Sequence, residues 1–267
     1  MNMRRSRITI TLQADLLGRV DALVDGVRIK NRSHAIEGLL TEALGERRLR
    51  TAVILAGGRG IVSPEGELSR IFAPYQSKLF VEYVLGWLRR EGIEEVIISA
   101  GEFASGVASR LGDGQKYGLH LSYLSRDEGT AGVLRLLTGR LRETFLLMNG
   151  DVLSDASLAD MFEFHKQNRA VCTLAVASAA QPAPFGNVVL KGSRITDFIE
   201  KPPAGREESY LVSAGIYLME PEIFNAVSPR HSSLERDLFP ALARAGKLHG
   251  YFLSGKWVSL GKPEPKK

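Results

Sequence analysis

The 267-residue sequence contains little cysteine and no long apolar run. Its single cysteine, Cys172, lies in an apolar stretch, where it is most simply a small core residue. An intrachain disulfide bond is therefore excluded. No apolar run approaches the roughly 20 residues needed to cross a bilayer, and the basic N-terminus lacks the apolar stretch of a signal peptide. We therefore expect a cytoplasmic protein with no membrane partner.

Most of the chain also lacks an excess of positive charge. Residues 1–50 carry 10 Lys and Arg against 6 Asp and Glu. Subtraction from the chain totals of 35 and 30 leaves 25 against 24 for residues 51–267. The charge excess at the N-terminal end predicts a polyanionic partner for that end, although a solvated basic face would explain the same charge.

The N-terminal segment has the pattern of one strand followed by two helices. Residues 7–12 alternate strictly between two faces. One face consists of Ile8, Ile10 and Leu12, and the other of Arg7, Thr9 and Thr11. Apolar residues recur at helical spacing over residues 16–27 and 36–44, and Ser33 can cap the second helix. A lone strand leaves its backbone groups unpaired, so we expect a second copy of the chain to pair with it.

This strand and helix pattern resembles the ribbon-helix-helix DNA-binding domain over residues 4–45. The resemblance implies a homodimeric domain over residues 1–48, whose antiparallel ribbon enters the major groove of double-stranded DNA. The outward side chains of Arg7, Thr9 and Thr11 would then contact base edges, and the amides around Ser33 would hold a phosphate. A ribbon used only for dimerisation is the alternative, and oligomers beyond the dimer stay open.

From residue 52 the pattern changes to short apolar strands that alternate with helical stretches. Strands are predicted over residues 52–56, 96–100 and 145–148, and helices over residues 80–90, 131–140 and 158–167. This alternation predicts an α/β fold with a doubly wound, mainly parallel, Rossmann-like sheet in a second domain over residues 50–267. A ligand of such a sheet lies at the carboxyl ends of the strands.

Three glycines follow the first predicted strand, at Gly57, Gly58 and Gly60. Backbone amides can approach phosphates closely at such a loop. The loop lacks the Gly-Lys-Ser/Thr of a Walker A motif, and Ser63 stands where a dinucleotide fingerprint has its third glycine. The glycines alone therefore indicate phosphate binding without identifying the ligand.

The surrounding motifs resemble those of sugar-1-phosphate nucleotidyltransferases over about residues 51–264. Besides the opening strand and glycine loop, the markers in chain order are Gly129-Thr130-Ala131-Gly132, Asn149-Gly150-Asp151, Phe185-Gly186, Glu200-Lys201-Pro202, Ala214-Gly215-Ile216-Tyr217 and Trp257-Val258-Ser259-Leu260-Gly261. Residues 233–240 and 248–251 are most similar to the branch that makes GDP-heptose or GDP-mannose.

The resemblance implies roles for the residues that match. The implied nucleotide-binding residues are Gly57, Gly58, Gly60 and Gly132. The implied sugar- and phosphate-binding residues are Gly186, Glu200 and Lys201. Asp151, a carboxylate at a strand end, would hold Mg²⁺ against the phosphates.

Three positions depart from the family pattern. Val62 replaces an arginine that steadies the transferring phosphoryl group, and Arg70 replaces a lysine beside the reacting phosphates. Ser259 replaces the second metal-binding aspartate. Phosphoryl transfer depends on positioned cations, and losing one such contact costs about 10²–10³ in rate. We therefore assign no catalytic residue, expect a degenerate domain, and leave Mg²⁺ with Asp151 alone.

Three hypotheses follow from these observations. The first is a DNA-binding transcriptional regulator whose degenerate domain senses a nucleotide or nucleotide-sugar. The second is an active sugar-1-phosphate nucleotidyltransferase that uses the ribbon for oligomerisation or autoregulation. The third is a scaffold with an empty pocket. The sequence favours the first hypothesis, because the cations and the metal ligand are replaced.

Overall fold

The computed structural model describes residues 8–26, 29–43, 49–57, 70–126, 128–203 and 205–260. The chain divides into two compact units, Met1–Arg48 and Leu49–Lys267. Each unit is described by itself below. No helix in the described part of the chain is both long and apolar enough to cross a membrane.

The N-terminal unit contains two helices, α1 (Ala14–Asp21) and α2 (Arg32–Ala43). An ion pair joins them, because the guanidinium of Arg32 contacts both carboxylate oxygens of Asp21, with Nη2 2.7 Å from Oδ2. The hydrogen bonds from Arg32 lower the pKa of Asp21. The described core of the unit is small, since only Val20 and Ala35 are buried there. Packing within one copy therefore leaves much apolar surface of this unit in water.

Two expectations for the N-terminal unit are corrected. Residues 8–12 form no strand, and Ile8 and Ile10 are exposed, because a strand requires a neighbour that the single chain does not supply within the described residues. The cap of α2 is Asn31 rather than Ser33, since the Asn31 side chain accepts the His34 backbone N–H at 3.0 Å. A ribbon-helix-helix domain is thus not shown by this unit.

The large unit is built on a mixed sheet that has nine strands in the described residues. In spatial order these are β5 (His120–Leu124), β4 (Glu95–Ser99), β1 (Thr51–Leu55), β6 (Phe145–Asn149), β11 (Leu211–Met219), β8 (Cys172–Ser178), β12 (Leu248–Phe252), β10 (Arg194–Glu200) and β9 (Gly186–Lys191). The first four strands are parallel, as expected. Beyond β6 the neighbours are largely antiparallel, so the expectation of a mainly parallel sheet holds only for the first half.

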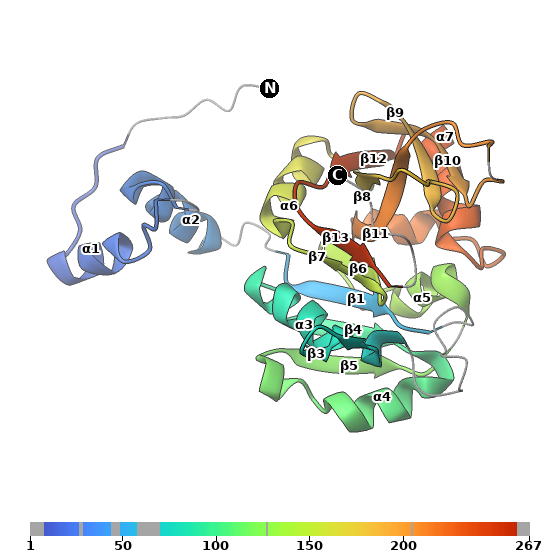
Figure 1. The fold of residues 1–267 in the computed structure, drawn as a ribbon. Coiled ribbons are helices and arrows are strands. Elements are labelled where there is room, and N and C mark those ends of the chain that lie inside the picture. The colour runs from blue at the N-terminus through green and yellow to red at the C-terminus, as the bar shows by residue number, and fades with distance from the viewer. Residues whose placement is uncertain are drawn as a thin grey trace. The chain divides into compact units, whose positions relative to one another are not determined.

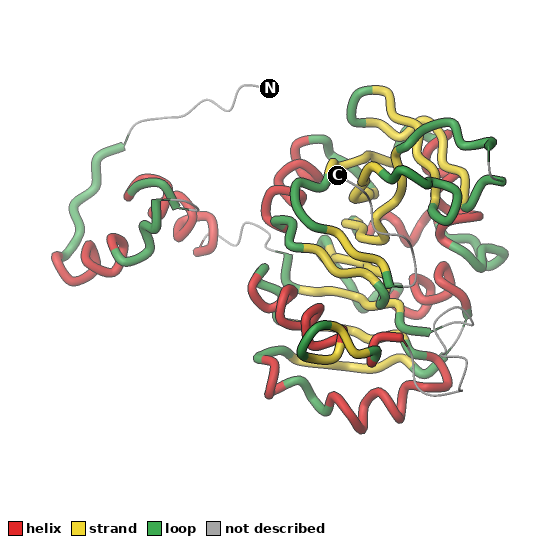
Figure 2. The backbone as a smooth tube through the Cα atoms, in the orientation of Figure 1, coloured by secondary structure: helices red, strands yellow, loops and turns green. Residues whose placement is uncertain are grey.

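Helices cover both faces of this sheet (Figures 1 and 2). They are α3 (Phe80–Arg90), α4 (Ala104–Leu111), α5 (Gly129–Leu137), α6 (Leu158–Gln167) and α7 (Phe239–Arg244). Successive residues of a strand face opposite sides, and β1 shows the result. Ile54 packs into the core with α3, α4 and α6, whereas Val53 packs into the core with α5 and α7. The α/β class predicted from the strand and helix alternation is confirmed.

Shorter elements complete the large unit. They are the strands β2 (Pro74–Tyr75), β3 (Lys78–Leu79), β7 (Val152–Ser154) and β13 (Trp257–Ser259), the 3-10 helices Arg70–Phe72, Gly101–Phe103, Gln115–Tyr117 and Pro221–Ala226, and a π-helix, Leu234–Leu238. Strand β13 pairs antiparallel with β7, which brings Ser259 opposite Val152. The chain's single cysteine, Cys172, begins β8 and is fully buried, and this burial raises the pKa of its thiol.

Candidate active site

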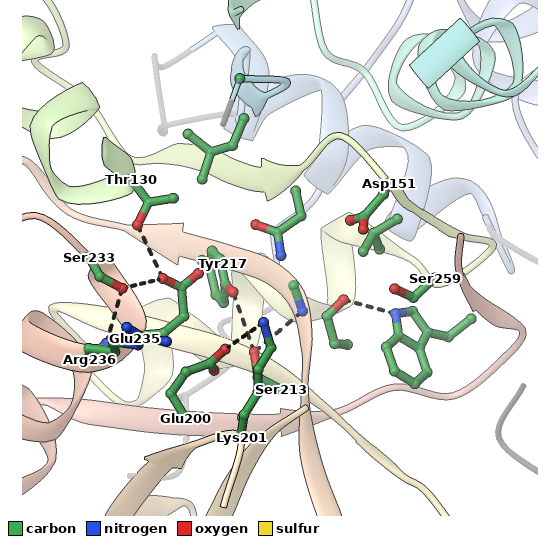
Figure 3. A pocket seen from close by; sticks show the side chains of 18 of the residues that line it. Thr130, Asp151, Glu200, Lys201, Ser213, Tyr217, Ser233, Glu235, Arg236 and Ser259 are labelled. Carbon is green, nitrogen blue, oxygen red and sulfur yellow. Dashed lines mark hydrogen bonds and ion pairs between the residues drawn. The ribbon is translucent and has the colours of Figure 1, made fainter. Parts of the chain in front are cut away.

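A cavity of about 450 Å³ opens at the carboxyl ends of β1 and β6. Leu55 and Gly57 border it where β1 ends, and Asn149 and Asp151 border it where β6 ends. This edge is where a doubly wound sheet binds its ligand, because the loops that follow parallel strands meet there. Figure 3 shows the polar side chains that line the cavity.

Asp151 and Ser259 both line this cavity, and Figure 3 labels their side chains. The pairing of β7 with β13 brings the two backbone segments together, and next to it the Leu260 N–H donates to the Asp151 carbonyl at 2.8 Å. Asp151 follows Gly150, whose N–H donates to the Leu55 carbonyl at 2.8 Å. The backbone on either side of Asp151 is therefore tied to the first strand and to the segment that follows the last strand of the unit.

A second wall carries Glu200 and Lys201 at the end of β10. The ammonium of Lys201 lies 3.5 Å from Oε1 of Glu200. Lys201 has a φ of 48°, which is rare for a residue with a side chain and costs backbone strain. Its own N–H donates to the Phe185 carbonyl at 3.1 Å, which holds this turn in place. The strained turn sets the direction in which the lysine side chain leaves the strand.

Gly186 faces Glu200 across the β9–β10 pair, and its position tolerates no side chain. A Cβ there would lie 2.4 Å from the Phe198 ring and 3.1 Å from Oε2 of Glu200. Glycine therefore lets the backbone of β9 pass close to the carboxylate and leaves the backbone of this strand open to the cavity.

The floor of the cavity is an irregular part of β11, where the register with β8 shifts between Ser213 and Tyr217. Gly215 adopts a φ of 73°, and a Cβ on it would lie 2.9 Å from Nδ2 of Asn149. The Trp257 indole donates to the Ala214 carbonyl at 2.8 Å, which ties β13 to this irregular segment. Bulges of this kind occur next to active sites, where they redirect side chains.

The third wall comes from the segment around the π-helix, and its residues lining the cavity are Ser232, Ser233, Glu235 and Arg236. Thr130, at the start of α5, lies against this wall. Burial and the neighbouring carboxylate of Glu235 raise the pKa of Tyr217 well above its usual range. The phenol therefore stays protonated at neutral pH and can act only as a neutral hydrogen-bonding group.

A smaller cavity of about 60 Å³ shares Leu55, Gly57 and Thr130 with the large one. The exposed side chain of Arg126 lines this cavity, and that of Arg236 lines the large one. With Lys201, these arginines are cations that the described residues place around the ligand edge. The sequence had given no role to either arginine.

The structure brings together most, but not all, of the residues predicted for the ligand site. Those that line the cavity are Gly57, Asp151, Gly186, Glu200, Lys201 and Ser259. Gly132 does not line it in the described part, because it is buried in α5, where a Cβ would lie 2.3 Å from Glu128 Cβ. Gly58, Gly60 and Val62 lie outside the described residues, and Arg70 begins a 3-10 helix without a described side chain.

The residues predicted to read DNA belong to the N-terminal unit. Thr9, Thr11 and Ser33 are exposed there, and Arg7 lies outside the described residues. Their proposed contacts with base edges and phosphate have no support in the geometry of this unit.

Sequence reasoning missed the lining residues Thr130, Ser233, Glu235 and Arg236. Residues 233–240 had served only to suggest a branch of the family, and Thr130 was read only as part of a glycine motif. The sequence did contain a signal for a polar site segment. Between residues 232 and 238 only Leu234 and Leu238 are apolar, and the other positions are Ser232, Ser233, Glu235, Arg236 and Asp237. Such a run before a helix start is typical of a segment that is anchored by its own polar contacts.

The donors around Asp151 fit a magnesium ion that arrives with phosphates. In the described part of the chain, no group of three or more His, Cys, Asp or Glu side chains could enclose a metal. Mg²⁺ does not require such a group, because it is commonly bound through one or two carboxylates, substrate phosphates and water. Asp151 supplies one carboxylate, and Ser259 lines the same cavity with a neutral hydroxyl.

Comparison with known proteins identifies the family. The family described as nucleotidyl transferase matches residues 51–265. This chain belongs to the nucleotidyl transferase family. The match covers the unit that carries the cavity, and residues 1–48 lie outside it.

Relatives of this nucleotidyl transferase domain are named as enzymes. A mannose-1-phosphate guanylyltransferase from Mycobacterium tuberculosis is 33% identical over 225 residues, which cover 80% of this chain and 61% of that protein. Mannose-1-phosphate guanylyltransferase 1 of Arabidopsis thaliana is 30% identical over 225 residues, covering 79% of this chain and 61% of its own. The chain thus spans about 61% of the length of these curated relatives.

Solved structures share the fold of the nucleotidyl transferase domain. HddC from Yersinia pseudotuberculosis superposes with a TM-score of 0.69 at 18% identity, over 80% of this chain and 95% of that chain. At this identity the likeness concerns the fold alone. It agrees with the mixed α/β architecture described above.

The relatives overturn the hypothesis of a DNA-binding regulator with a degenerate domain. The proteins that match over about 80% of this chain are named for guanylyl transfer, which favours the active enzyme, our second hypothesis. The expected loss of activity rested on the combined replacement of three family positions. Arg126 and Arg236, which the structure places at the ligand edge, had no part in that expectation.

Proposed function

We propose that the protein is an active sugar-1-phosphate nucleotidyltransferase, which converts a nucleoside triphosphate and a sugar 1-phosphate into a nucleotide-sugar and pyrophosphate. The observation that carries this proposal is that Asp151 and the Glu200–Lys201 pair line the same cavity. One side suits the phosphates of a nucleotide beside Gly57, and the other suits a sugar phosphate. Both substrates can therefore meet in one cavity.

In this reaction an oxygen of the sugar 1-phosphate attacks the α-phosphorus of the nucleotide. The bond from the α-phosphorus to the bridging oxygen breaks, and pyrophosphate leaves with the bonding electrons. Negative charge accumulates around the α-phosphorus, so the protein must position cations there. Lys201 would hold and orient the attacking phosphate, since its ammonium is anchored at the cavity wall by Glu200.

Asp151 would hold Mg²⁺ against the nucleotide phosphates. The bound ion would neutralise charge on the phosphate oxygens. The backbone of Gly57 lies at the end of β1, where it can approach the nucleotide closely. The names of the relatives make GTP and mannose 1-phosphate the first substrate pair to test.

The test is a coupled assay that measures the release of pyrophosphate from GTP and mannose 1-phosphate in the presence of Mg²⁺. We expect turnover within the usual enzyme range of about 1–10³ s⁻¹ and a loss of nearly all of it in Asp151→Asn. Addition of EDTA should have the same effect as the substitution. Pyrophosphate release no faster than that of the Asp151→Asn protein, across all nucleotides and common hexose 1-phosphates, would refute the proposal.

We also propose that the N-terminal unit serves self-association. Of the eight exposed large apolar side chains in the described residues, six lie in this unit: Ile8, Ile10, Leu16, Leu23, Leu39 and Leu40. Such surface is unfavourable in water, and a second copy offers the same surface in return. Residues 8–12 of two copies can then supply each other's missing strand partner.

A further inference from the structure

The wall around the π-helix is fixed by its own polar contacts. The hydroxyl of Ser233 accepts the Arg236 backbone N–H at 3.2 Å and so caps the helix. The carboxylate of Asp237 accepts the backbone N–H groups of Ser232 and Ser233, at 2.8 and 2.9 Å, and these bonds lower its pKa. A π-helical turn is rare and frequently marks a functional site. The wall is therefore a rigid support for the side chains that it presents.

Glu235 projects from this support and is held by a second element. Its Oε2 accepts hydrogen bonds from Thr130 Oγ1 at 3.1 Å and from Ser233 Oγ at 2.9 Å. Thr130 Oγ1 in turn accepts the Leu234 backbone N–H at 2.9 Å. Thr130 and Glu235 are 105 residues apart in the sequence, so the carboxylate is located by the tertiary fold and not by its own turn alone.

The second carboxylate oxygen of Glu235 is left for a ligand. The structure records no hydrogen bond to Oε1 from any described residue, although Glu235 lines the 450 Å³ cavity. Glu235 is half-buried, so this oxygen can bond to water until a ligand displaces that water, and the lost bond must then be replaced. The ligand that fills the cavity must then present a hydrogen-bond donor at this point.

The chemistry of this position favours a sugar hydroxyl. A phosphate offers only negative oxygens and is repelled by a carboxylate. A purine edge is recognised best by two parallel bonds to both carboxylate oxygens, but Oε2 already accepts two bonds from the protein. A single hydroxyl donor needs only Oε1. Glu200 lines another wall of the same cavity, so two carboxylates face a ligand with several hydroxyl groups.

We infer that Glu235 accepts a hydroxyl of the sugar ring and thereby selects the sugar 1-phosphate that this protein uses. This inference rests on the proposed function and adds a specificity-determining residue to it. Thr130 acts as a positioning residue, because its hydroxyl fixes the direction of Oε1. A bond to a charged acceptor inside a cavity discriminates strongly against a sugar that lacks the donor.

The experiment compares the wild type with Glu235→Gln on mannose 1-phosphate and on its 2-, 3-, 4- and 6-deoxy analogues. In the wild type, one deoxy analogue should lose about 10- to 100-fold in kcat/KM relative to mannose 1-phosphate. In Glu235→Gln this preference should shrink to within a few-fold, while the KM for GTP is unchanged. Thr130→Val should weaken the same preference through the KM of the sugar phosphate, with kcat little changed.

The matched control is Glu163→Gln, which removes an exposed carboxylate of α6 that accepts a hydrogen bond from Gln167. It should leave the preference among deoxy sugars intact. If Glu235→Gln does not fold, as judged by its melting curve, Glu235→Asp carries the same comparison. Equal losses for mannose 1-phosphate and all its analogues, or a raised KM for GTP, would overturn the inference while the proposed function stands.

A binding experiment separates the proposed role of Glu235 from the proposed reaction. Isothermal titration with mannose 1-phosphate alone measures binding without turnover. If the wild type binds the sugar phosphate, Glu235→Gln should bind it about 10-fold or more weakly. An inactive wild type that shows this loss would refute the proposed reaction and support the role of Glu235. Equal binding by wild type and variant would refute that role.

Discussion

At the scale of single residues, the site depends on a few side chains held in unfavourable positions. Lys201 keeps a left-handed backbone, and Gly186 leaves no room for a methyl group beside Phe198. Such strain persists only where surrounding contacts impose it, and it is concentrated at functional sites. The lysine therefore offers a specific test, because its charge can be removed while its length is kept.

Lys201→Met should lower kcat/KM of nucleotidyl transfer by about 10²–10³ fold, since one cation that positions the attacking phosphate is lost. The measurement is pyrophosphate release under saturating GTP and varied sugar 1-phosphate. Lys247→Met is the matched control, because this lysine is similarly exposed and also contacts a glutamate, Glu222, at 2.9 Å. A comparable loss in the control would remove the special role of Lys201.

A second residue prediction concerns stability and pH. Glu220 accepts hydrogen bonds from Lys166 and Thr144, and His165 Nε2 lies 3.3 Å from its carboxylate. Burial raises the pKa of Glu220, but the hydrogen bonds of His165, Lys166 and Thr144 outweigh it and lower that pKa to about 2. The depressed pKa contributes stability above the unfolded value of about 4.5, and this contribution is lost as the pH falls towards 2.

Glu220→Gln should therefore lower the free energy of unfolding at pH 7 by on the order of 2 kcal/mol. The deficit relative to wild type should shrink as the pH falls from about 4.5 towards 2. Urea unfolding at several pH values measures both effects. Glu222→Gln, in the 3-10 helix that begins directly after Glu220, is the control, since an exposed ion pair contributes only about 0–1 kcal/mol. A deficit of Glu220→Gln that is independent of pH would contradict the interpretation.

At the scale of elements, local pattern located the parallel half of the sheet and its helices. The helices predicted over residues 80–90 and 158–167 have those bounds, because the apolar spacing of a helix is a local feature of the sequence. The helix predicted over residues 131–140 instead spans Gly129–Leu137, since it starts on the glycine that lies against Ser232. Strand direction beyond β6 depends on pairing between distant segments, which periodicity does not encode.

The residues of the candidate site likewise divide into those that a local motif reveals and those that only the tertiary fold reveals. Asp151 and the Glu200–Lys201 pair were named from motifs that lie within one loop, and the structure places them on one cavity, although their roles stay predictions. Glu235 was missed as a site residue because its orientation comes from Thr130, far away in the sequence. The exclusion of Gly132 from the cavity lining likewise follows from close packing against Glu128, which its motif does not reveal.

The irregular part of β11 supports a prediction at this scale. Gly215 and Gly246 both have positive φ, but a Cβ on Gly246 meets nothing within 4 Å, whereas one on Gly215 meets Asn149 and Val152 at about 3 Å. Gly215→Ala should therefore destabilise the protein by about 1–3 kcal/mol more than Gly246→Ala, because only the first adds a steric conflict to the strain. Urea denaturation of the two variants makes the comparison. Equal losses of stability in the two variants would show that the floor of the cavity can shift to accommodate the added methyl group.

At the scale of the whole molecule, self-association is predicted to depend on one face of residues 8–12. Ile8→Lys with Ile10→Lys places two charges on the apolar face and should convert the dimer to a monomer in sedimentation velocity. Thr9→Lys with Thr11→Lys adds the same charge on the opposite face and should leave the dimer intact. Wild-type protein that sediments as a monomer, or equal effects of the two pairs, would contradict this assignment.

The burial of Cys172 gives the molecule a built-in chemical reporter. Only the thiolate reacts with thiol reagents, and this thiol is enclosed in the sheet with a raised pKa, so the native protein should resist labelling. Because the sequence has no other cysteine, one engineered on the cavity wall could carry a single dye under native conditions. Labelling of Cys172 itself would then occur only when the central strands separate. The rate of that labelling would therefore measure the rate at which the sheet opens.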